Sequence, residues 1–373
     1  MYSRRDRIVA ILVLLPSIVL LGVFVYWFIG QNVYFSLTDW GTGAALAKTP
    51  QLSFVGLDNY ANLFTGFLET RFRQDLVNVF FFTLLFVGGA LGLGLLFAIF
   101  LDREIHAEGV VRTIFLYPMA LSFIVTGTIW RWLFNPSGGL NELPEVFGLS
   151  QLQFGWLNSN AQYLQFNWQD LPMVTALVVG IAFALIAVHR WRHASRRAAV
   201  SVGIPAVLLL AYYLWGDAIT PETFALPFSE THGFNVALIG VVIAAAWQFS
   251  GYTMALYLAG MRGVSDDVRE SAEIDGCNIV QFYRFVILPL VKPITLSALI
   301  ILGHISLKTF ALVFVMTGPD YPPTDLPSVL MFVKTFRSNL FAEGAAIAVV
   351  LFVLVALVVV PYLVSALRER AAT

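Results

Sequence analysis

The chain alternates between long apolar runs and shorter polar connections. A helix needs roughly 17–25 mostly apolar residues to cross about 30 Å of hydrocarbon. The runs that reach or approach this length are Ile8–Ile29, Val77–Leu101, Val111–Phe134, Leu171–Val188, Ala199–Gly216, Phe234–Met261, Pro293–Met316 and Gly344–Leu367. The pattern therefore predicts an all-α polytopic membrane protein of about eight transmembrane helices.

One connection, Met261–Pro293, is far more polar than the spans on either side of it. Its charged residues include Asp266, Asp267, Arg269, Glu270, Glu273 and Asp275. Charged side chains at a bilayer centre cost roughly 2.5–3.5 kcal/mol each on insertion scales. We therefore expect this segment to lie outside the membrane.

The same connection carries the signals of two short helices. Ser265 or Asp267 can cap the first helix, and Asp267 and Glu270 have the spacing of a capping box. Gly276 can adopt the left-handed conformation that ends a helix. A second, more apolar helix is expected from Ile279, and prolines then turn the chain back toward lipid.

Composition narrows the class of protein. The chain is 58% hydrophobic and only 12% charged, whereas soluble domains carry about 25% charged residues. The net charge of −1 does not bear on nucleic-acid binding, but no basic stripe with interleaved aromatics appears, so nucleic acid is not expected as a partner. The single cysteine, Cys277, excludes an intrachain disulfide and a thiolate metal cage. We expect no metal and no cofactor in this chain.

The basic residues predict the orientation in the membrane. The first apolar run follows three arginines and is too long for a signal peptide, so we expect it to be retained. With the N-terminus inside, most of the 22 Lys and Arg residues fall on the cytoplasmic side. Both termini and Met261–Pro293 are therefore predicted to be cytoplasmic.

The polar connection also carries a family motif. The run E-S-A-E-I-D-G, followed after nine residues by V-I-L-P, resembles the EAA motif of ABC importer permeases, E-A-A-x3-G-x9-I-x-L-P. The matching residues are Glu270, Ala272, Gly276, Leu288 and Pro289. Ser271 and Val286 replace an alanine and an isoleucine of the pattern, and the spacing is kept throughout.

Further segments extend the resemblance to carbohydrate-specific ABC permeases. They are Y-F-S-L-T-D-W, F-V-G-L-D-N-Y-A-N-L-F, W-L-F-N-P-S-G-G-L-N, A-A-W-Q-F-S-G-Y and V-M-T-G-P. Together they cover the chain except for about residues 161–232. The chain thus resembles maltose-type sugar importers, in the larger of their two permease classes.

The resemblance implies a role for the polar connection and a set of partners. In this family the EAA segment docks on an ATPase subunit, which assigns Glu270, Ser271, Ala272, Asp275, Gly276, Leu288 and Pro289 to ATPase coupling. Expected partners are a second homologous permease, two copies of an ABC ATPase and an extracytoplasmic sugar-binding protein. The chain has no G-x-x-x-x-G-K-[ST] motif, so ATP and Mg are expected on the ATPase and this chain is not expected to be an enzyme.

The resemblance also suggests residues along a sugar path inside the membrane. The candidates are Tyr252, Gln248, Phe249, Ala245, Ser306, His304 and Ser122. Ser306 stands where the family has a sugar-binding asparagine, and the spacing around Ser122 is shifted by one residue. Polar groups inside spans favour a transport path, but serine and glutamine also bond across helices as packing contacts, and His304 fits a core histidine equally well.

The segment of about residues 165–232 has no counterpart in the family pattern. Its two short spans are joined by the basic turn 190–197, and an even number of spans preserves the direction of the helices that follow. We therefore expect a type I ABC importer core of six helices, at about 77–160 and 234–367 with the N-terminal span 8–29, plus an inserted two-helix hairpin. The whole chain, 1–373, is expected to be one transmembrane domain in a bacterial or archaeal inner membrane.

Other functions remain open on the sequence alone. An ABC permease for a non-sugar solute, such as a polyol phosphate, would share the same motifs. An ion-coupled secondary transporter predicts carboxylates within the spans, and the eight predicted spans contain none. His189 and His193 have metal-like spacing but lack a glutamate between them, so a metal site there is not expected. The pair Gly88 and Gly92 is interpreted as a helix-packing motif.

Overall fold

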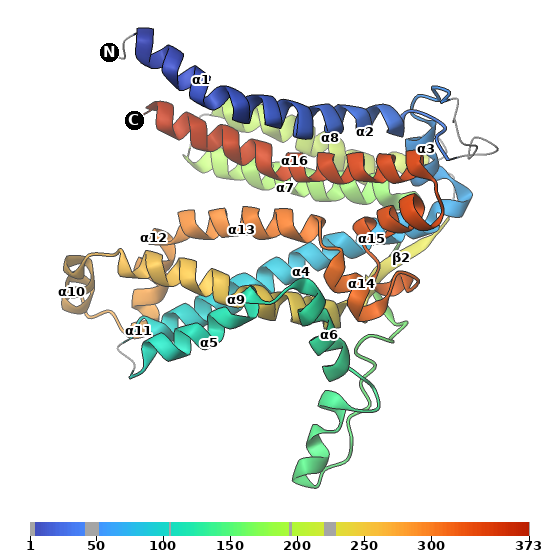
Figure 1. Ribbon diagram of the computed structural model, residues 1–373. Helices are drawn as coiled ribbons and strands as arrows, with labels where there is room; N and C mark the ends of the chain where they lie inside the picture. The colour runs from blue at the N-terminus through green and yellow to red at the C-terminus, as the bar shows by residue number, and fades with distance from the viewer. Residues whose placement is uncertain (1–3, 42–51, 104–105, 194–195, 220–228, 373) are drawn as a thin grey trace. The chain divides into compact units, whose positions relative to one another are not determined.

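The computed structural model describes residues 4–41, 52–103, 106–193, 196–219 and 229–372 (Figure 1). It divides into two compact units. The first comprises Met1–Ala61, Asp75–Ala161 and Asn235–Thr373, and the second comprises Asn62–Gln74 and Gln162–Phe234. Residues 42–51 and 220–228 and positions 194–195 of the predicted basic turn lie outside the described residues.

The chain is mainly helical, as predicted. From the N-terminus to residue 161 its elements are α1 (Arg4–Leu21), the π-helical turn η1 (Gly22–Trp27), α2 (Phe28–Ser36), α3 (Asp58–Thr65), η3 (Phe67–Glu69), α4 (Thr70–Leu101), α5 (Glu108–Ala120), α6 (Phe123–Leu133), η4 (Gly139–Asn141) and η5 (Leu143–Phe147). After the second unit they are α9 (Leu238–Arg262), α10 (Asp266–Ile274), α11 (Ile279–Gln281), the π-helical turn η7 (Phe282–Ile287), α12 (Leu288–Leu290), α13 (Lys292–Leu307), α14 (Ala311–Thr317), η8 (Pro322–Thr324), α15 (Pro327–Phe332), the π-helical turn η9 (Val333–Arg337) and α16 (Phe341–Ala372).

The second unit contains the predicted hairpin. Its elements are β1 (Gln162–Asn167), η6 (Trp168–Asp170), α7 (Leu171–His193), α8 (Arg196–Ile219) and β2 (Thr231–Asn235), whose last residue belongs to the first unit. Helices α7 and α8 pack along their length, with Leu209 and Leu210 against Gly180. Strands β1 and β2 pair in a two-stranded sheet that the all-α prediction did not include.

A buried ionic network joins the start of α4 to β2 within this second unit. Arg73, whose side chain is 1% exposed, binds the Glu230 carboxylate through Nη2 and, at 2.7 Å, through Nε. His232 lies between Glu230 (3.2 Å) and Gln74 (2.9 Å) and against the Trp168 ring. Burial raises the pKa of Glu230, but the bonds from Arg73 and His232 outweigh it and hold that pKa below its usual value. Burial lowers the pKa of His232.

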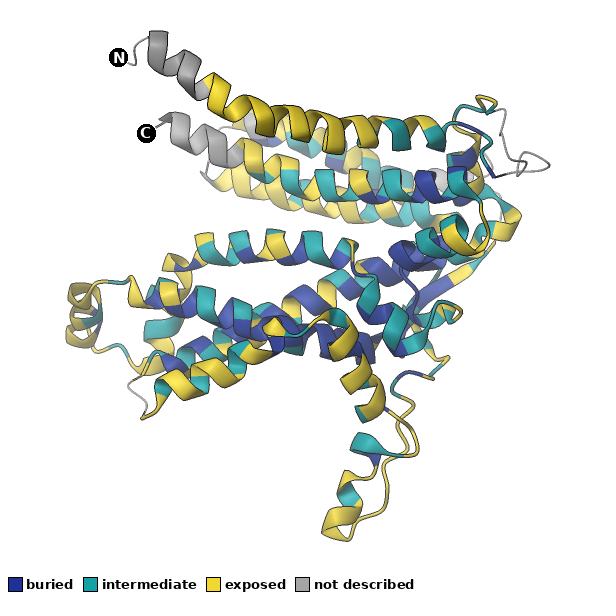
Figure 2. Ribbon diagram, in the orientation of Figure 1, coloured by how far each residue is buried: buried dark blue, intermediate teal, exposed yellow. Residues whose placement is uncertain are grey.

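The number of membrane spans differs from the eight predicted. Among the described residues, five helices are long and apolar enough to cross a membrane, or up to seven if each of two bent pairs is one span. Ala199–Trp215 of α8 is a shorter apolar helix. The first span continues to Ser36, and α4 begins at Thr70 and so includes the buried Asp75. The apolar side chains of α1 from Ile11 to Leu21 are exposed (Figure 2), as expected of a helix in contact with lipid.

Two predicted spans are wrong as single helices. Val111–Phe134 is α5 and α6, which meet at 100°. Pro293–Met316 is interrupted after Leu307, and α14 starts at Ala311. Side chains satisfy the backbone at both breaks: Ser122 caps α6 by accepting from the Val125 N–H at 3.3 Å, and Thr309 donates to the Ile305 carbonyl at 3.0 Å.

Helix α9 is the centre of the first unit (Figure 2). Glycines let the neighbouring helices approach it closely. A Cβ at Gly251 would lie 2.0 Å from the Phe115 carbonyl oxygen of α5, and one at Gly94 of α4 would lie 1.9 Å from the Thr253 hydroxyl. Gly88 and Gly92, interpreted from the sequence as a packing pair, contact no other described residue, and Gly94 of the same helix makes the close contact with α9.

Candidate functional site: a coupling segment, a broken-helix cluster and a pocket

Helix α10 forms the first part of the polar connection. Ser265 occupies the N-cap position, but its side chain makes no capping bond, and Asp267 lies inside the helix. The predicted capping box between Asp267 and Glu270 is therefore wrong. A capping box forms instead at the start of α11, where Asn278 and Gln281 exchange bonds of 2.9 Å. The N-x-x-Q spacing is its signal in the sequence.

Gly276 ends α10 as predicted. Its φ is +73°, in the left-handed region. The Gly276 N–H donates to the Glu273 carbonyl at 2.9 Å, and the Cys277 N–H donates to the Ala272 carbonyl at 3.0 Å. These two bonds define a Schellman motif, which satisfies the last carbonyls of the helix and reverses the chain.

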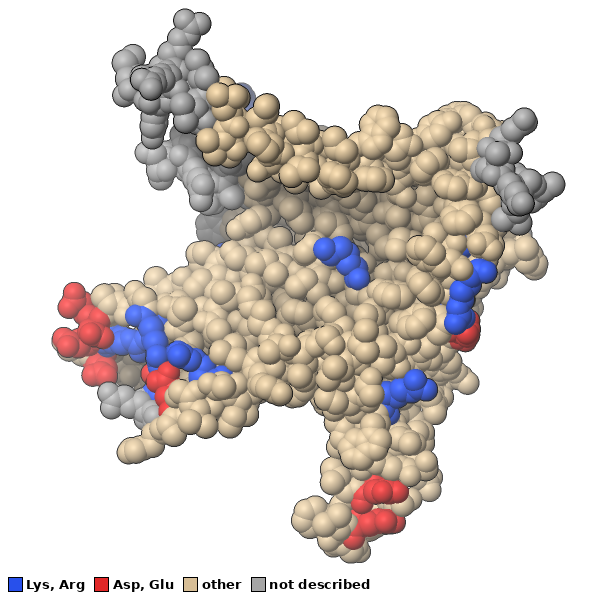
Figure 3. Space-filling view, viewed as in Figure 1, with Lys and Arg blue, Asp and Glu red and all other residues tan. Residues whose placement is uncertain are grey.

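Acidic side chains cover the outer face of α10. Glu270, Ser271, Glu273 and Asp275 are exposed, and Ala272 is buried on the inner face. Ile274 is 86% exposed among these charges, although isoleucine is usually buried. Charged side chains gather at this end of the molecule (Figure 3). Leu288 and Pro289 are also exposed, on the returning helix α12.

The inner face of α10 is fixed to the end of α4 by one carboxylate. Asp102, whose side chain is 2% exposed, accepts two bonds from Arg269, at 3.1 and 3.2 Å. It also accepts from the Tyr283 hydroxyl at 2.9 Å. Arg269 donates further to the Met261 carbonyl at 2.9 Å and lies over the Phe282 ring. The sequence analysis missed Asp102, because it lies 167 positions from Arg269.

An apolar core lies directly beneath these anchors. It combines buried residues from the ends of α4 and α9 with others from η7 and the start of α13: Ala98, Leu101, Met254, Tyr257, Leu258, Met261, Ile287 and Val291. The Tyr257 hydroxyl donates to Thr295 of α13 at 3.0 Å. Displacement of α10 would therefore be passed to several helices together, because a packed core resists local deformation.

Four predicted path residues lie on α9 beside the break between α5 and α6. Gln248 donates at 2.9 Å to the Leu121 carbonyl, which the break leaves without a helical partner. Phe249 packs edge-on against Phe86 of α4 and near Phe123 of α6. Ala245 is buried next to them, and Tyr252 is half-buried one turn further along. The structure thus brings this subset together at a broken helix.

The other three predicted path residues lie elsewhere. Ser306 of α13 is fully buried, where its hydroxyl donates to the Gly303 carbonyl (2.6 Å) and lies 2.8 Å from the Thr83 hydroxyl of α4. This is the packing role that the sequence left open. His304 is half-buried on the same helix. Ser122 is exposed, and its hydroxyl caps α6.

Three buried polar atoms of α6 and α9 beside the break have no partner among the described residues, and we call their side chains the broken-helix cluster. These are the Gln248 Oε1, the Thr126 hydroxyl and the Trp130 Nε1. Thr126 and Trp130 stand four positions apart on α6, and the Trp130 ring contacts Trp247 of α9 at 5.6 Å. Unsatisfied buried polar atoms call for a partner. Nothing in the sequence pattern indicates Thr126, since a threonine within an apolar run is common.

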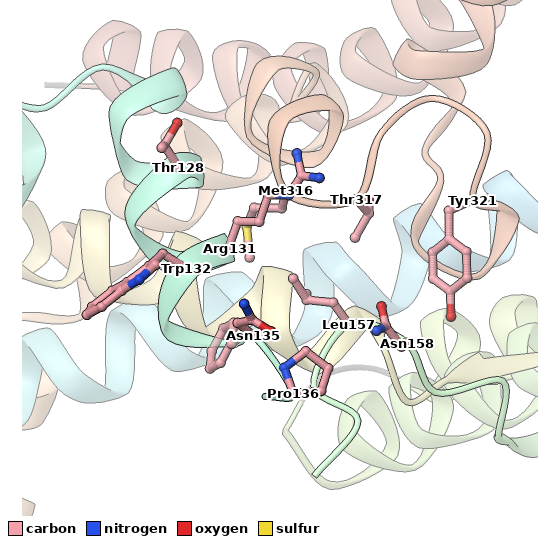
Figure 4. Close-up of a pocket in the computed structure, with 11 residues that line it drawn as sticks. Thr128, Arg131, Trp132, Asn135, Pro136, Leu157, Asn158, Met316, Thr317 and Tyr321 are labelled. Atoms are coloured by element: carbon pink, nitrogen blue, oxygen red, sulfur yellow. The ribbon is translucent and has the colours of Figure 1, made fainter. Parts of the chain in front are cut away.

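A cavity of about 550 Å³ opens between the C-terminal ends of α6 and α14 (Figure 4). Its lining includes Arg131, Trp132, Asn135, Asn158 and Tyr321. We call it the α6–α14 pocket. None of the predicted path residues lines it, although two motifs of the family resemblance, W-L-F-N-P and V-M-T-G-P, supply part of its wall.

The α6–α14 pocket and α10 lie at opposite ends of α9. Gly240, in the first turn of α9, contacts Leu157, which also lines the pocket. Helix α9 continues from there to Arg262, next to α10. At 1.5 Å per residue these points are about 33 Å apart, the thickness of a bilayer core.

Comparisons with known proteins identify the family. A family described as binding-protein-dependent transport system inner membrane component matches residues 176–373. A probable ABC transporter permease protein of Pyrococcus horikoshii is 33% identical over 355 residues, which are 95% of this chain and 94% of that protein. The chain belongs to this family. It is a multi-pass inner membrane component of an ABC transport system, and the resemblance to carbohydrate ABC importer permeases is confirmed.

A second relative also matches over most of the chain, and a solved structure has a similar fold. The xylose/arabinose import permease protein XacH of Haloferax volcanii is 30% identical over 92% of this chain and 84% of that protein. A bacterial ABC transporter involved in the import of the acidic polysaccharide alginate has a chain with a TM-score of 0.60, at 17% identity and over 95% of this chain and 94% of that chain. The type I permease fold expected from the sequence is thereby confirmed.

Proposed function

We propose that this permease forms the sugar path of an ATP-driven importer and is driven through α10. The observation that carries the proposal is the arrangement of the coupling segment: an exposed acidic helix held on a rigid apolar core. Such a helix costs solvation energy in lipid but suits a groove with basic residues on a partner protein. Relatives named for xylose/arabinose import and for trehalose/maltose transport support a sugar as the solute.

The proposed assembly contains a second homologous permease, two ABC ATPases that bind ATP and Mg, and an extracytoplasmic sugar-binding protein. A solved alginate transporter complex with a substrate-bound periplasmic protein, similar in fold, supports that last partner. Glu270 would pair with a basic ATPase residue, and the exposed Ile274 would fill an apolar contact at the centre of the interface. Both chain termini and α10 would then be cytoplasmic.

The proposed mechanism is alternating access. Closure of the two ATPases would pull on α10, and the bonds from Arg269 and Tyr283 to Asp102 would carry that movement to α4. The core beneath α10 would carry it to α9 and α13. Gln248 on α9 bonds to the broken helix, so the movement would reach the unsatisfied polar atoms there. Those atoms suit sugar hydroxyl groups, which both donate and accept hydrogen bonds.

The test is ATP-dependent sugar uptake by the complex reconstituted in proteoliposomes. Glu270→Gln and Gly276→Ala should each lower uptake strongly, because one removes the proposed charge contact and the other strains the left-handed end of α10. Asp266→Asn is the matched control, since it removes one exposed charge from the same helix outside the proposed contact. If both variants kept wild-type uptake, the proposal that α10 docks on the ATPase would be refuted.

A further inference from the structure

The α6–α14 pocket has the features of a ligand site that the coupling segment and the broken-helix cluster do not explain. Its volume of about 550 Å³ falls within the range of 300–1,000 Å³ that is usual for small-molecule sites. Gly240 of α9 contacts Leu157 in the pocket wall. Gln248 lies eight positions further along α9, which is about 12 Å at 1.5 Å per residue. The pocket shares no lining residue with the broken-helix cluster, although both use α6.

The polar groups Arg131, Asn135 and Asn158 are exposed and make few hydrogen bonds to the described residues, so a ligand could replace water at their donors. Arg131 makes a single bond among the described residues, at 3.3 Å to the Val315 carbonyl, although a guanidinium carries five N–H donors. The Asn158 side chain makes no hydrogen bond within the described part of the chain, and the Asn135 side chain accepts from Ser137 but donates to none of the described groups. No carboxylate lines the pocket.

The aromatic groups complete the character of the site. Trp132 is 68% exposed at its edge, and Tyr321 stands on the opposite side, where its hydroxyl bonds to the Ser159 carbonyl at 3.2 Å (Figure 4). Planar amide and guanidinium donors beside aromatic rings match a sugar ring, which has a rim of hydroxyl groups and apolar C–H faces. A purely apolar ligand would leave these donors unpaired.

We propose that the α6–α14 pocket is an outer carbohydrate site, which accepts a sugar ring before it moves along α9 to the broken-helix cluster. The proposal rests on the proposed import function. The pocket lies at the end of α9 away from α10, so in the proposed orientation it opens to the outside. Binding involves no covalent step, and the ligand class is a monosaccharide or the terminal ring of an oligosaccharide.

The experiment is protection of an introduced cysteine from a membrane-impermeant maleimide. Asn158→Cys places the reporter in the pocket, and Asn135→Cys is a second reporter if the first reacts poorly. The native Cys277 follows α10 on the opposite side of the membrane, so the wild-type protein measures its background. Glu145→Cys on η5 is the matched control, because it is exposed and does not line the pocket.

Proteoliposomes of the complex are labelled with and without each sugar of a monosaccharide and disaccharide panel, in the absence of ATP and binding protein. A sugar at ten times its dissociation constant should slow labelling at position 158 about elevenfold and leave position 145 unchanged. The protection should persist in a Gln248→Ala variant, which removes a group of the broken-helix cluster. Protection that disappears with Gln248→Ala would assign the effect to that cluster instead.

Equal labelling rates with and without every sugar, at both reporters, would overturn the outer site. ATP-dependent uptake is measured on the same wild-type proteoliposomes. ATP-dependent uptake without protection of the introduced cysteine would refute only the outer site. A lack of ATP-dependent uptake of every sugar would refute the proposed function itself.

Discussion

Replacement of Asp102 by asparagine should uncouple ATP hydrolysis from transport. The substitution keeps the side-chain shape but removes the charge that accepts two bonds from Arg269 and one from Tyr283. Hydrogen bonds to a charged group contribute roughly 1.5–3 kcal/mol each. Arg269 keeps a side-chain exposure of 28%, so water can compensate part of the loss. We therefore expect α10 docking to weaken by about 3 kcal/mol, or about 150-fold.

The assay combines hydrogen exchange with a coupling ratio. Amide exchange of residues 266–276 should accelerate, and the number of sugar molecules imported per ATP hydrolysed should fall while ATP hydrolysis continues. Asp320→Asn is the matched control, because Asp320 accepts from Arg337 in an exposed ion pair, and exposed pairs contribute little. If Asp102→Asn left both the exchange rate and the import ratio at wild-type values, the role of Asp102 in transmitting movement would be refuted.

Two further predictions concern packing and pH. Gly94→Ala should destabilise the permease by about 1–3 kcal/mol through overpacking against α9. Gly92→Ala should have little effect, because position 92 faces open space. Thermal unfolding of the two variants in detergent compares their stability, and equal losses would contradict the assigned packing face. The ionic network of the second unit should weaken in acid, because a carboxylate with a lowered pKa contributes stability above its unfolded value near 4.5 and loses it as the pH falls through the folded value. His232, whose pKa is also lowered, adds to this loss below about pH 6.5. In Glu230→Gln the acid dependence of amide exchange in β2 should become smaller, and an unchanged pH profile would argue against the assignment.

Much of the coupling segment could be predicted from the sequence because its structure is local. The Gly276 N–H bonds to the carbonyl three positions earlier and the Cys277 N–H to the carbonyl five positions earlier, so the glycine alone indicates the turn. The exposure of Glu270 follows from the cost of placing a carboxylate in lipid. The capping box at Asn278 was equally local and could have been found from its spacing.

The broken span shows what local patterns do not contain. Val111–Phe134 is apolar throughout, and hydropathy does not distinguish one straight helix from two that meet at 100°. The break is stable because Gln248, 127 positions away, donates to the carbonyl that it exposes. The same limit applied to the glycines of α4: the sequence indicated that this helix packs through glycine, but only its rotation against α9 decides that Gly94, and not Gly92, makes the contact.

The membrane class, the family and the position and C-terminal end of the coupling helix therefore follow from the sequence alone. These depend on composition, on motif spacing and on bonds within a few residues. The tertiary structure decided how α10 is held, where the helices break and where the α6–α14 pocket opens. Each of these depends on groups far apart in the chain, such as Asp102 with Arg269 or Arg131 with Asn158, and their proximity follows from the packing of whole helices around α9.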